Sequence, residues 1–163
     1  MPLMEIRKFN IADARRISEL IRRNLLTVNS RFYPRKVVDF MVSFYTPQKV
    51  RELASERRIF VAIEDQSIIG TASLGLDKVY NVFVDPGQHG RGIGRILMGH
   101  IESLALSQKI RMLSLDASLN AIPFYEKLGY IRGKLKSSPY CGDTCEMFKT
   151  LTGTKKNANS QPV

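Results

Sequence analysis

Apolar positions in the first part of the chain recur with the periods of a strand and then of a helix. Residues 4–8 form a short strand-like run, and a helix with one apolar face extends from there to about Val28. Asn10 is followed three residues later by Asp13, a capping-box-like pair, so this pair is expected to start the helix.

Two prolines and one polar turn divide the next stretch. Pro34 and Pro47 each fit the first turn of a further helix, because a proline there gives up no helical hydrogen bond. The β-rich runs 59–63 and 68–74 flank the polar residues 64–67, which is typical of a hairpin. The pattern therefore predicts two helices followed by an antiparallel pair of strands.

The centre of the chain has the pattern of a strand, a glycine loop, a helix and a strand. The apolar run 79–84 continues the antiparallel meander, and apolar residues at helical spacing follow from Ile93 to Ala105. Residues 112–116 are again strand-like. Because a strand–helix–strand unit joins parallel strands by a right-handed crossover, 79–84 and 112–116 are expected to be parallel in a mixed sheet.

A short helix and two strands complete the pattern. Asn120 is expected to cap the helix, Pro123 is tolerated in its first turn, and Gly129 ends it. Residues 130–131 and 146–149 indicate the last two strands. The succession of elements predicts an α/β fold.

The chain of 163 residues is long enough to bury one sizeable core. We expect a single domain over residues 1–153. Residues 154–163 are polar with almost nothing apolar, which predicts a flexible tail.

Composition narrows the class of protein. No apolar run approaches the roughly 20 residues of a membrane span, and residues 1–10 lack an apolar signal region. The two cysteines, Cys141 and Cys145, form neither a zinc-site pattern nor a disulfide framework, so we expect no metal. A cytoplasmic protein without membrane contact is the interpretation that fits best.

The net charge of +10 raises the question of a nucleic-acid partner. Four arginines lie opposite the apolar stripe of the first helix, where charges are usually just solvated: Arg15, Arg16, Arg22 and Arg23. The pattern therefore does not favour nucleic acid, and a polyanionic cofactor would benefit from the same charge. Oligomeric state is not visible in the sequence, which leaves a homodimer open.

The glycine loop carries the most specific chemistry in the sequence. Glycines at 90, 92 and 94 let the backbone approach a ligand closely, and the helix that follows directs unpaired N–H groups toward it. Arg91 and Arg95 add positive charge beside the helix start. The run predicts a site for a pyrophosphate.

The loop admits other interpretations. A dinucleotide-binding site would use Asp116 downstream, but the glycines are spaced G-x-G-x-G rather than G-x-G-x-x-G. A nucleoside-triphosphate loop is excluded more firmly, because no G-K-[ST] follows the glycines. A turn that merely joins strand to helix remains the plain alternative.

Two motifs in order resemble the GNAT superfamily of N-acetyltransferases. They are the runs VFVDP with HGRGIG at 82–94 and AIPFYEKLGY at 121–130. The likeness covers about residues 4–150. It implies a mixed and mostly antiparallel twisted sheet flanked by helices, with a central parallel strand pair splayed around acetyl-CoA. It also implies transfer of the acetyl group, by direct attack, to a primary amine of a small molecule or peptide.

The resemblance also assigns roles to residues. Tyr125 is implied as the catalytic acid that protonates the departing thiolate, although the alternative is a tyrosine that packs in the core. The strand N–H around Phe83 or Val84 is implied to hold the oxyanion. The implied cofactor-binding residues are Val82, Phe83, Val84, His89, Gly90, Arg91, Gly92, Ile93, Gly94, Arg95, Asn120 and Tyr125. His89 and Ser118 depart from the residues usual in the family.

The acceptor side is less defined. Segments 29–58 and 136–144 are expected to build its pocket, with the aromatic residues Phe32, Tyr33, Phe44, Tyr45 and Tyr140, which mildly favours an apolar or acidic acceptor. No general base is singled out among Glu64, Asp85, Asp116 and Glu126, and a water relay is the alternative. A rival hypothesis is a CoA-binding regulatory module, or one that docks on nucleic acid, without turnover.

Overall fold

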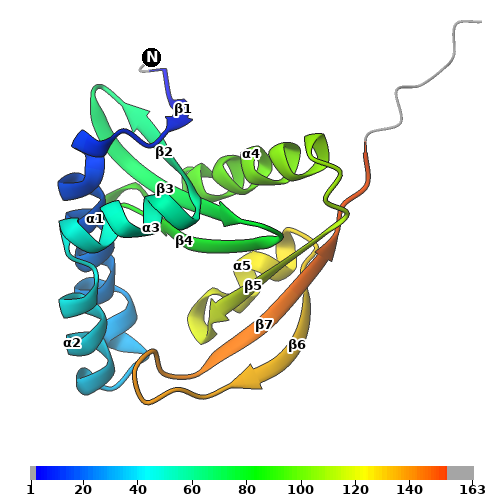
Figure 1. Ribbon diagram of the computed structural model, residues 1–163. Coiled ribbons are helices and arrows are strands. Elements are labelled where there is room, and N and C mark those ends of the chain that lie inside the picture. Colours follow the sequence, from blue (N-terminus) through cyan, green and yellow to red (C-terminus); the bar gives the residue numbers. More distant parts are fainter. Residues whose placement is uncertain (1–2, 154–163) are drawn as a thin grey trace, which may run out of the picture.

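The computed structural model describes residues 3–153, and the predicted tail 154–163 lies outside the described residues. The described chain forms one seven-stranded mixed sheet in the order β1-β2-β3-β4-β5-β7-β6 (Figure 1). Its strands are β1 (Glu5–Lys8), β2 (Arg58–Glu64), β3 (Ser67–Gly75), β4 (Lys78–Val84), β5 (Met112–Ser118), β6 (Ile131–Lys136) and β7 (Thr144–Thr150). Every neighbouring pair is antiparallel except β4 and β5, which are parallel. The predicted fold class is confirmed.

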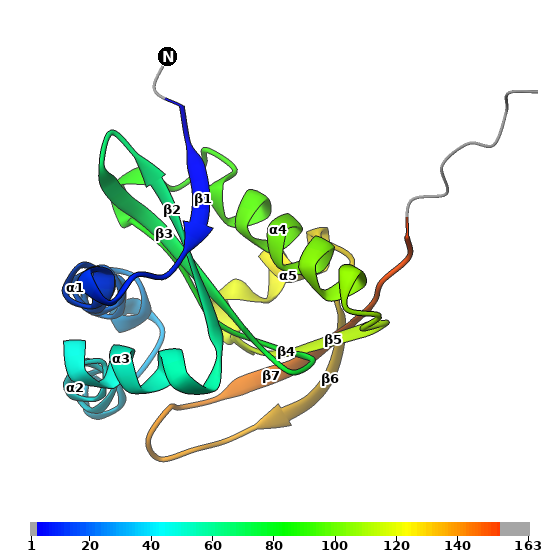
Figure 2. The ribbon, with the colours of Figure 1, turned by 45° about the horizontal axis from the view of Figure 1, so that its top comes forward.

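Helices cover both faces of the sheet. They are α1 (Ala14–Thr27), α2 (Arg35–Phe44), α3 (Pro47–Glu56), α4 (Ile93–Ser107) and α5 (Ile122–Lys127). The helices α1, α2 and α3 lie on one face, and α4 and α5 lie on the other (Figure 2). Side chains along β2 alternate between the two faces of the sheet. Ile59 and Val61 pack in the core formed with α1, α2 and α3, while Phe60 and Ala62 pack in the core formed with α4 and α5.

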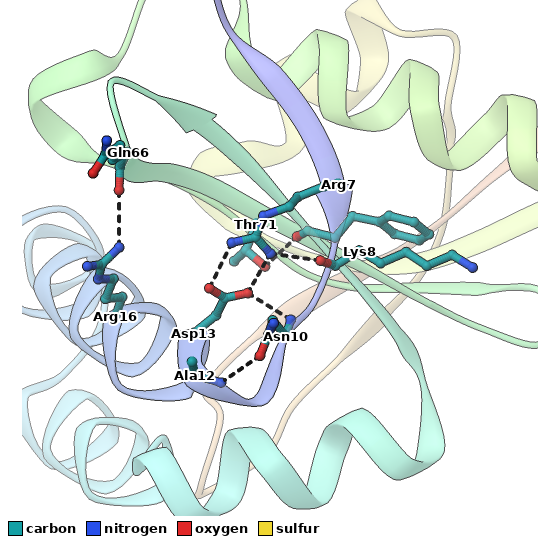
Figure 3. Close-up of polar contacts among 9 residues, drawn as sticks. Arg7, Lys8, Asn10, Ala12, Asp13, Arg16, Gln66 and Thr71 are labelled. Carbon is teal, nitrogen blue, oxygen red and sulfur yellow. Dashed lines mark hydrogen bonds and ion pairs between the residues drawn. The ribbon is translucent and has the colours of Figure 1, made fainter.

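The predicted capping box is present before α1 (Figure 3). The Asn10 side chain accepts a hydrogen bond from the Ala12 N–H at 3.1 Å, and the Asp13 carboxylate accepts one from the Asn10 N–H at 2.8 Å. The box starts a 3-10 turn, Ile11–Asp13, which continues into the helix. Arg7 on β1 donates two hydrogen bonds to the same carboxylate, at 2.8 and 2.9 Å, and so fixes the helix start to the sheet.

The local turn predictions hold with one shift. The β2–β3 hairpin turns at Asp65 and Gln66, whose φ angles are +47° and +62°, as a tight hairpin requires. Pro47 is in the first turn of α3 as predicted. Pro34 instead precedes α2, because its extended ψ of 146° lets its carbonyl accept the N–H groups of Val37 and Val38 from outside the helix.

Candidate active site

The central parallel strands separate soon after they meet. The ladder between β4 and β5 holds one residue pair, Lys78 with Ser114, and the Ser114 N–H bonds the Asp77 carbonyl at 3.0 Å. On its other edge β5 pairs with β7 along its whole length, and β4 pairs with β3 as far as Val84. Beyond Lys78 and Ser114, the described strands β4 and β5 share no residue pair. One edge of β4 is thus left facing a gap, with backbone groups that need partners.

The direction of these backbone groups follows from the β3–β4 ladder. The Asp85 N–H donates to the Ile69 carbonyl at 2.8 Å, so Asp85 faces β3. Because backbone groups alternate between the two edges of a strand, the N–H and C=O of Val84 face the gap, whereas those of Phe83 face Thr71 on β3. The backbone of Val84 is therefore on the gap edge of β4, whereas the backbone of Phe83 is on the edge paired with β3.

The glycine loop leads from this gap into α4. Gly90 and Gly92 have φ angles of +83° and +79°, a conformation that side chains other than glycine rarely adopt. The first intrahelical bond runs from Ile96 N–H to the Gly92 carbonyl at 3.1 Å. The preceding N–H groups therefore have no partner in the helix. These are the amides of Ile93, Gly94 and Arg95, all in the predicted set.

Charged side chains around the loop are mostly held by ion pairs. Arg91 donates to both oxygens of Glu64 at 2.7 and 2.8 Å, and this hydrogen bonding lowers the pKa of the Glu64 carboxyl. Asp85 accepts from Arg23 at 2.8 Å. The sequence pattern places the Arg91 charge beside an anionic ligand. In the structure that charge is compensated by the Glu64 carboxylate at the β2–β3 hairpin. The N–H groups at the start of α4 are the donors that have no partner in the helix.

His89 lies at the mouth of the gap. Its Nε2 is 3.0 Å from the Val84 carbonyl oxygen. A carbonyl only accepts, so Nε2 carries the proton and donates. The contact links the loop to the free edge of β4.

Tyr125 and Asn120 lie on the β5 side of the gap. Tyr125 is buried on α5, its ring centroid 5.0 Å from that of Phe124 and 5.8 Å from that of Tyr130, and burial raises the pKa of its hydroxyl. Asn120 does not cap α5: it lies inside the 3-10 turn Leu119–Ala121, and Ala121 holds the cap position. The capping prediction is wrong because that turn runs directly into the helix. The Asn120 Oδ1 atom is buried without a hydrogen-bond partner among the described residues.

A cleft of about 580 Å³ opens between β4 and β5 on the side of α2. Of the predicted cofactor residues it is lined by Val82, Phe83 and Tyr125, while the loop residues lie beyond its edge. Both predicted acceptor segments contribute. Phe32 and Tyr140 are not among the lining residues and are 58% and 59% exposed. The acceptor-side aromatic residues that do line it are Tyr33, Phe44 and Tyr45.

A second hollow, of about 630 Å³, lies between the end of α3, the β3–β4 hairpin and the end of α4. Its lining includes neither the glycine loop nor Tyr125. It shares Arg57 with the lining of the cleft.

The wall of the cleft contains a bulge in β4 that the sequence did not reveal. Two residues, Asn81 and Val82, oppose Ala72 on β3, and Asn81 has a φ of +51°. The Asn81 side chain donates to Tyr45 Oη and accepts from Arg57 Nη1, both at 2.8 Å. A positive φ at a non-glycine residue costs conformational energy, and such residues are frequent at functional sites. The two hydrogen bonds of the Asn81 side chain hold this strained bulge in place.

A charged cluster forms another part of the wall. Asp116 accepts from Lys78 at 2.8 Å and from Lys136 at 3.0 Å. Burial by itself raises the pKa of the Asp116 carboxyl, but the two ammonium groups outweigh it and the net pKa is below the ordinary value. Of the four candidate bases, Asp116 alone lines the cleft. Its ionised form is stabilised, which makes it a weak base.

The basic face of α1 is largely engaged within the molecule. Arg15 pairs with Glu19, Arg23 with Asp85, and Arg16 donates to the Gln66 carbonyl at 3.1 Å (Figure 3). Among residues 3–153, no group of three or more metal-ligating side chains is present. No helix in that range is long and apolar enough to span a membrane.

The comparisons agree with this geometry. The sequence model of the Acetyltransferase (GNAT) domain matches residues 55–132, which contain the gap, the loop and α5. The chain also superposes on a GCN5-related N-acetyltransferase from Rhodopseudomonas palustris with a TM-score of 0.85 and 23% identity, covering 90% of this chain and 95% of that one. The PaiA N-acetyltransferase from Thermoplasma acidophilum, in complex with coenzyme A, gives 0.73 and 21%, covering 91% and 99%. In sequence the chain thus matches the GNAT acetyltransferase domain over residues 55–132, and its fold is that of GNAT N-acetyltransferases.

Curated relatives match over shorter stretches. A glucosamine 6-phosphate N-acetyltransferase from Trypanosoma brucei brucei is 32% identical over 39% of this chain and 50% of its own length. A peptidyl-lysine N-acetyltransferase from Salmonella typhimurium is 30% identical over 56% of this chain and 65% of its own. The chain thus spans about half to two thirds of these two relatives, whose acceptors differ from one another.

Proposed function

We propose that this protein is an acetyl-CoA-dependent N-acetyltransferase that acetylates a primary amine of a small molecule or peptide. The observation that supports this best is the gap between β4 and β5. A parallel pair that separates after a single residue pair leaves a strand edge open, and that edge leads directly to a helix N-terminus with left-handed glycines. An extended ligand that ends in a pyrophosphate fits both features.

Acetyl-CoA would be held by backbone groups. The amides of residues 93–95, with the loop glycines before them, would bind the pyrophosphate, and the gap-facing C=O of Val84 would accept a hydrogen bond from a pantetheine amide. The buried Asn120 Oδ1, which lacks a partner among the described residues, is suited to accept an N–H from the same arm. The solved Thermoplasma relative holds coenzyme A, and a Salmonella relative its cofactor acetyl-CoA.

The bound thioester supplies an activated acyl carbon for attack by the amine. The uncharged amine nitrogen forms the new bond to that carbon, the carbon–sulfur bond breaks, and the proton lost from the nitrogen passes to water. The Val84 N–H faces the gap and would stabilise the negative charge that develops on the acyl oxygen. The Tyr125 phenol is kept protonated by burial and would donate a proton to the departing sulfur.

The experiment is release of free thiol from acetyl-CoA with primary amines as acceptors, with the acetylated product identified by mass spectrometry. Stoichiometric thiol and acetylamine would support the proposal. If acetyl-CoA stabilises the protein against heat but no amine yields product, a CoA-binding module without turnover is the better account. If acetyl-CoA causes no stabilisation at saturating concentration, the proposal fails.

A further inference from the structure

Cationic side chains are in excess on the wall of the cleft. Three of them line it, Arg57, Lys78 and Lys136, against one carboxylate, Asp116. The Lys136 ammonium also contacts Glu146 at 2.8 Å, which lies next to Asp116 on the adjacent strand β7. Even with that carboxylate included, the cluster has more positive than negative charge.

The cluster is built from elements far apart in sequence. Lys78 begins β4, Asp116 lies on β5, and Lys136 ends β6. Each oxygen of the Asp116 carboxylate accepts from a different lysine, so the carboxylate fixes the two ammonium groups on either side of it. The side chains of Lys78 and Lys136 remain 28% and 43% exposed, and an ammonium has three donors. Donors are left for a ligand in the cleft.

Arg57 adds a planar cation to the same wall. Its guanidinium lies 3.8 Å from the centroid of the Tyr80 ring, and Lys78 Nζ lies 5.6 Å from that centroid. One Arg57 nitrogen donates to Asn81 Oδ1. A guanidinium has five donors in a fork that suits carboxylate and phosphate oxygens. Arg57 therefore extends the positively charged part of the cleft wall to the bulge of β4.

A primary amine is itself a cation at neutral pH before it reacts. In a cleft with excess positive charge, an amine with no other charge is repelled, and a polyamine more so. If the acceptor also carries an anionic group, attraction between that group and the positive wall can outweigh the repulsion of its ammonium. We propose, on the basis of the proposed acetyltransferase function, that the acceptor is a primary amine that carries a carboxylate or phosphate, held by Lys78, Lys136 and Arg57.

The test compares matched acceptors. ω-Amino acids with two to six methylene groups are set against alkylamines of the same length, with aminoalkyl phosphates as a second anionic arm and spermidine as a polycation. The expected result is a kcat/KM at least about 10-fold higher for an acceptor that carries an anionic group than for the alkylamine of the same length, with spermidine poorest. The two anionic arms distinguish carboxylate from phosphate.

Two lysine substitutions test whether the preference for anionic acceptors arises in the cleft. Lys136→Gln is expected to raise KM for the anionic acceptor by about 10-fold and to lower KM for the alkylamine of the same length, because one repelling charge is removed, with little change in KM for acetyl-CoA. Lys134→Gln is the matched control, since Lys134 is an exposed lysine on the same strand and is absent from the cleft lining. Raised salt should weaken the preference of the parent protein and have little effect on that of Lys136→Gln.

The outcomes separate this inference from the function on which it rests. Equal kcat/KM for the members of every pair, or a preference that Lys136→Gln leaves intact, overturns the anionic-acceptor proposal alone. Turnover of no member of any pair, by protein that acetyl-CoA stabilises against heat, also overturns it. Absence of acetyl-CoA binding contradicts the proposed function instead.

Discussion

The side chain of Asn81, in the bulge of β4, donates a hydrogen bond to the hydroxyl of Tyr45 at the end of α2. Arg57, at the end of α3, bonds the other atom of the same amide. A strained strand residue is thus fixed by the two helices that flank the acceptor side of the cleft. The strand edge that would hold the thioester is thereby coupled to the pocket that would hold the amine.

Replacing Asn81 tests this coupling. Asn81→Ala removes both hydrogen bonds and places a Cβ-bearing residue without local hydrogen bonding at a φ of +51°. We expect a loss of about 1–3 kcal/mol in the free energy of unfolding and a fall in kcat/KM on the order of 10-fold. Asn81→Gly tolerates the φ but lacks the side chain, so comparing the two by denaturant unfolding and kinetics separates strain from hydrogen bonding. Wild-type kcat/KM in both variants would contradict the coupling.

Tyr125→Phe tests the proposed proton donor. Because the phenol stays protonated over the working pH range, its loss should lower kcat on the order of 100-fold and leave KM for acetyl-CoA nearly unchanged. Steady-state kinetics with thermal unfolding as a check on folding is the measurement. If the Tyr125→Phe variant retains wild-type kcat, the tyrosine only packs in the core.

The glycine loop offers a matched pair of substitutions. Gly92 has a φ of +79° at the start of α4, whereas Gly99 lies inside α4, and an added Cβ at either position meets no atom within 4 Å. Gly92→Ala should cost about 1–2 kcal/mol through backbone strain and weaken acetyl-CoA binding. Gly99→Ala should stabilise the helix by up to about 1 kcal/mol and leave binding unchanged. Denaturant unfolding measures the two stabilities and calorimetric titration the two affinities for acetyl-CoA. Equal affinities in the two variants would show that the loop conformation does not matter for binding.

The Arg7–Asp13 pair predicts how stability depends on pH. Hydrogen bonds from Arg7 lower the pKa of the Asp13 carboxyl below the ordinary 3.8. The ionised form favours the folded state, so its contribution is complete above pH 3.8 and is lost as the pH falls through the folded-state pKa. Asp13→Asn should lose about 1–3 kcal/mol at neutral pH and show a flatter decline in acid. Urea unfolding of both proteins between about pH 5 and 2 tests this, and parallel curves would count against it.

The sequence was sufficient where local patterns decide the structure. The hairpin at Asp65 and Gln66, the loop before α4 and the crossover to a parallel strand each depend on neighbouring residues or on a general rule of chirality. The cleft chemistry depends instead on strand order. Lys136 reaches Asp116 because β7 lies between β5 and β6, and no spacing in the sequence encodes that.

One local prediction failed, and two other features had no signal in the sequence. Arg91 stays a predicted diphosphate contact, but its pair with Glu64 depends on the β2–β3 hairpin lying against the loop, which no sequence spacing indicates. Asn120 was expected to precede a helix, but a 3-10 turn already encloses it. The φ of Asn81 had no sequence signal, because asparagine tolerates positive φ but nothing in the apolar run 79–84 indicates that this residue adopts it.

Amide hydrogen exchange with and without acetyl-CoA tests the central claim most directly. The account predicts slower exchange on binding at Val84, on the open edge of β4, and at residues 90–95, with β1 and β2 unchanged. Protection confined to other parts of the molecule, or no protection at saturating acetyl-CoA, would contradict the assignment of the gap between β4 and β5 as the cofactor site.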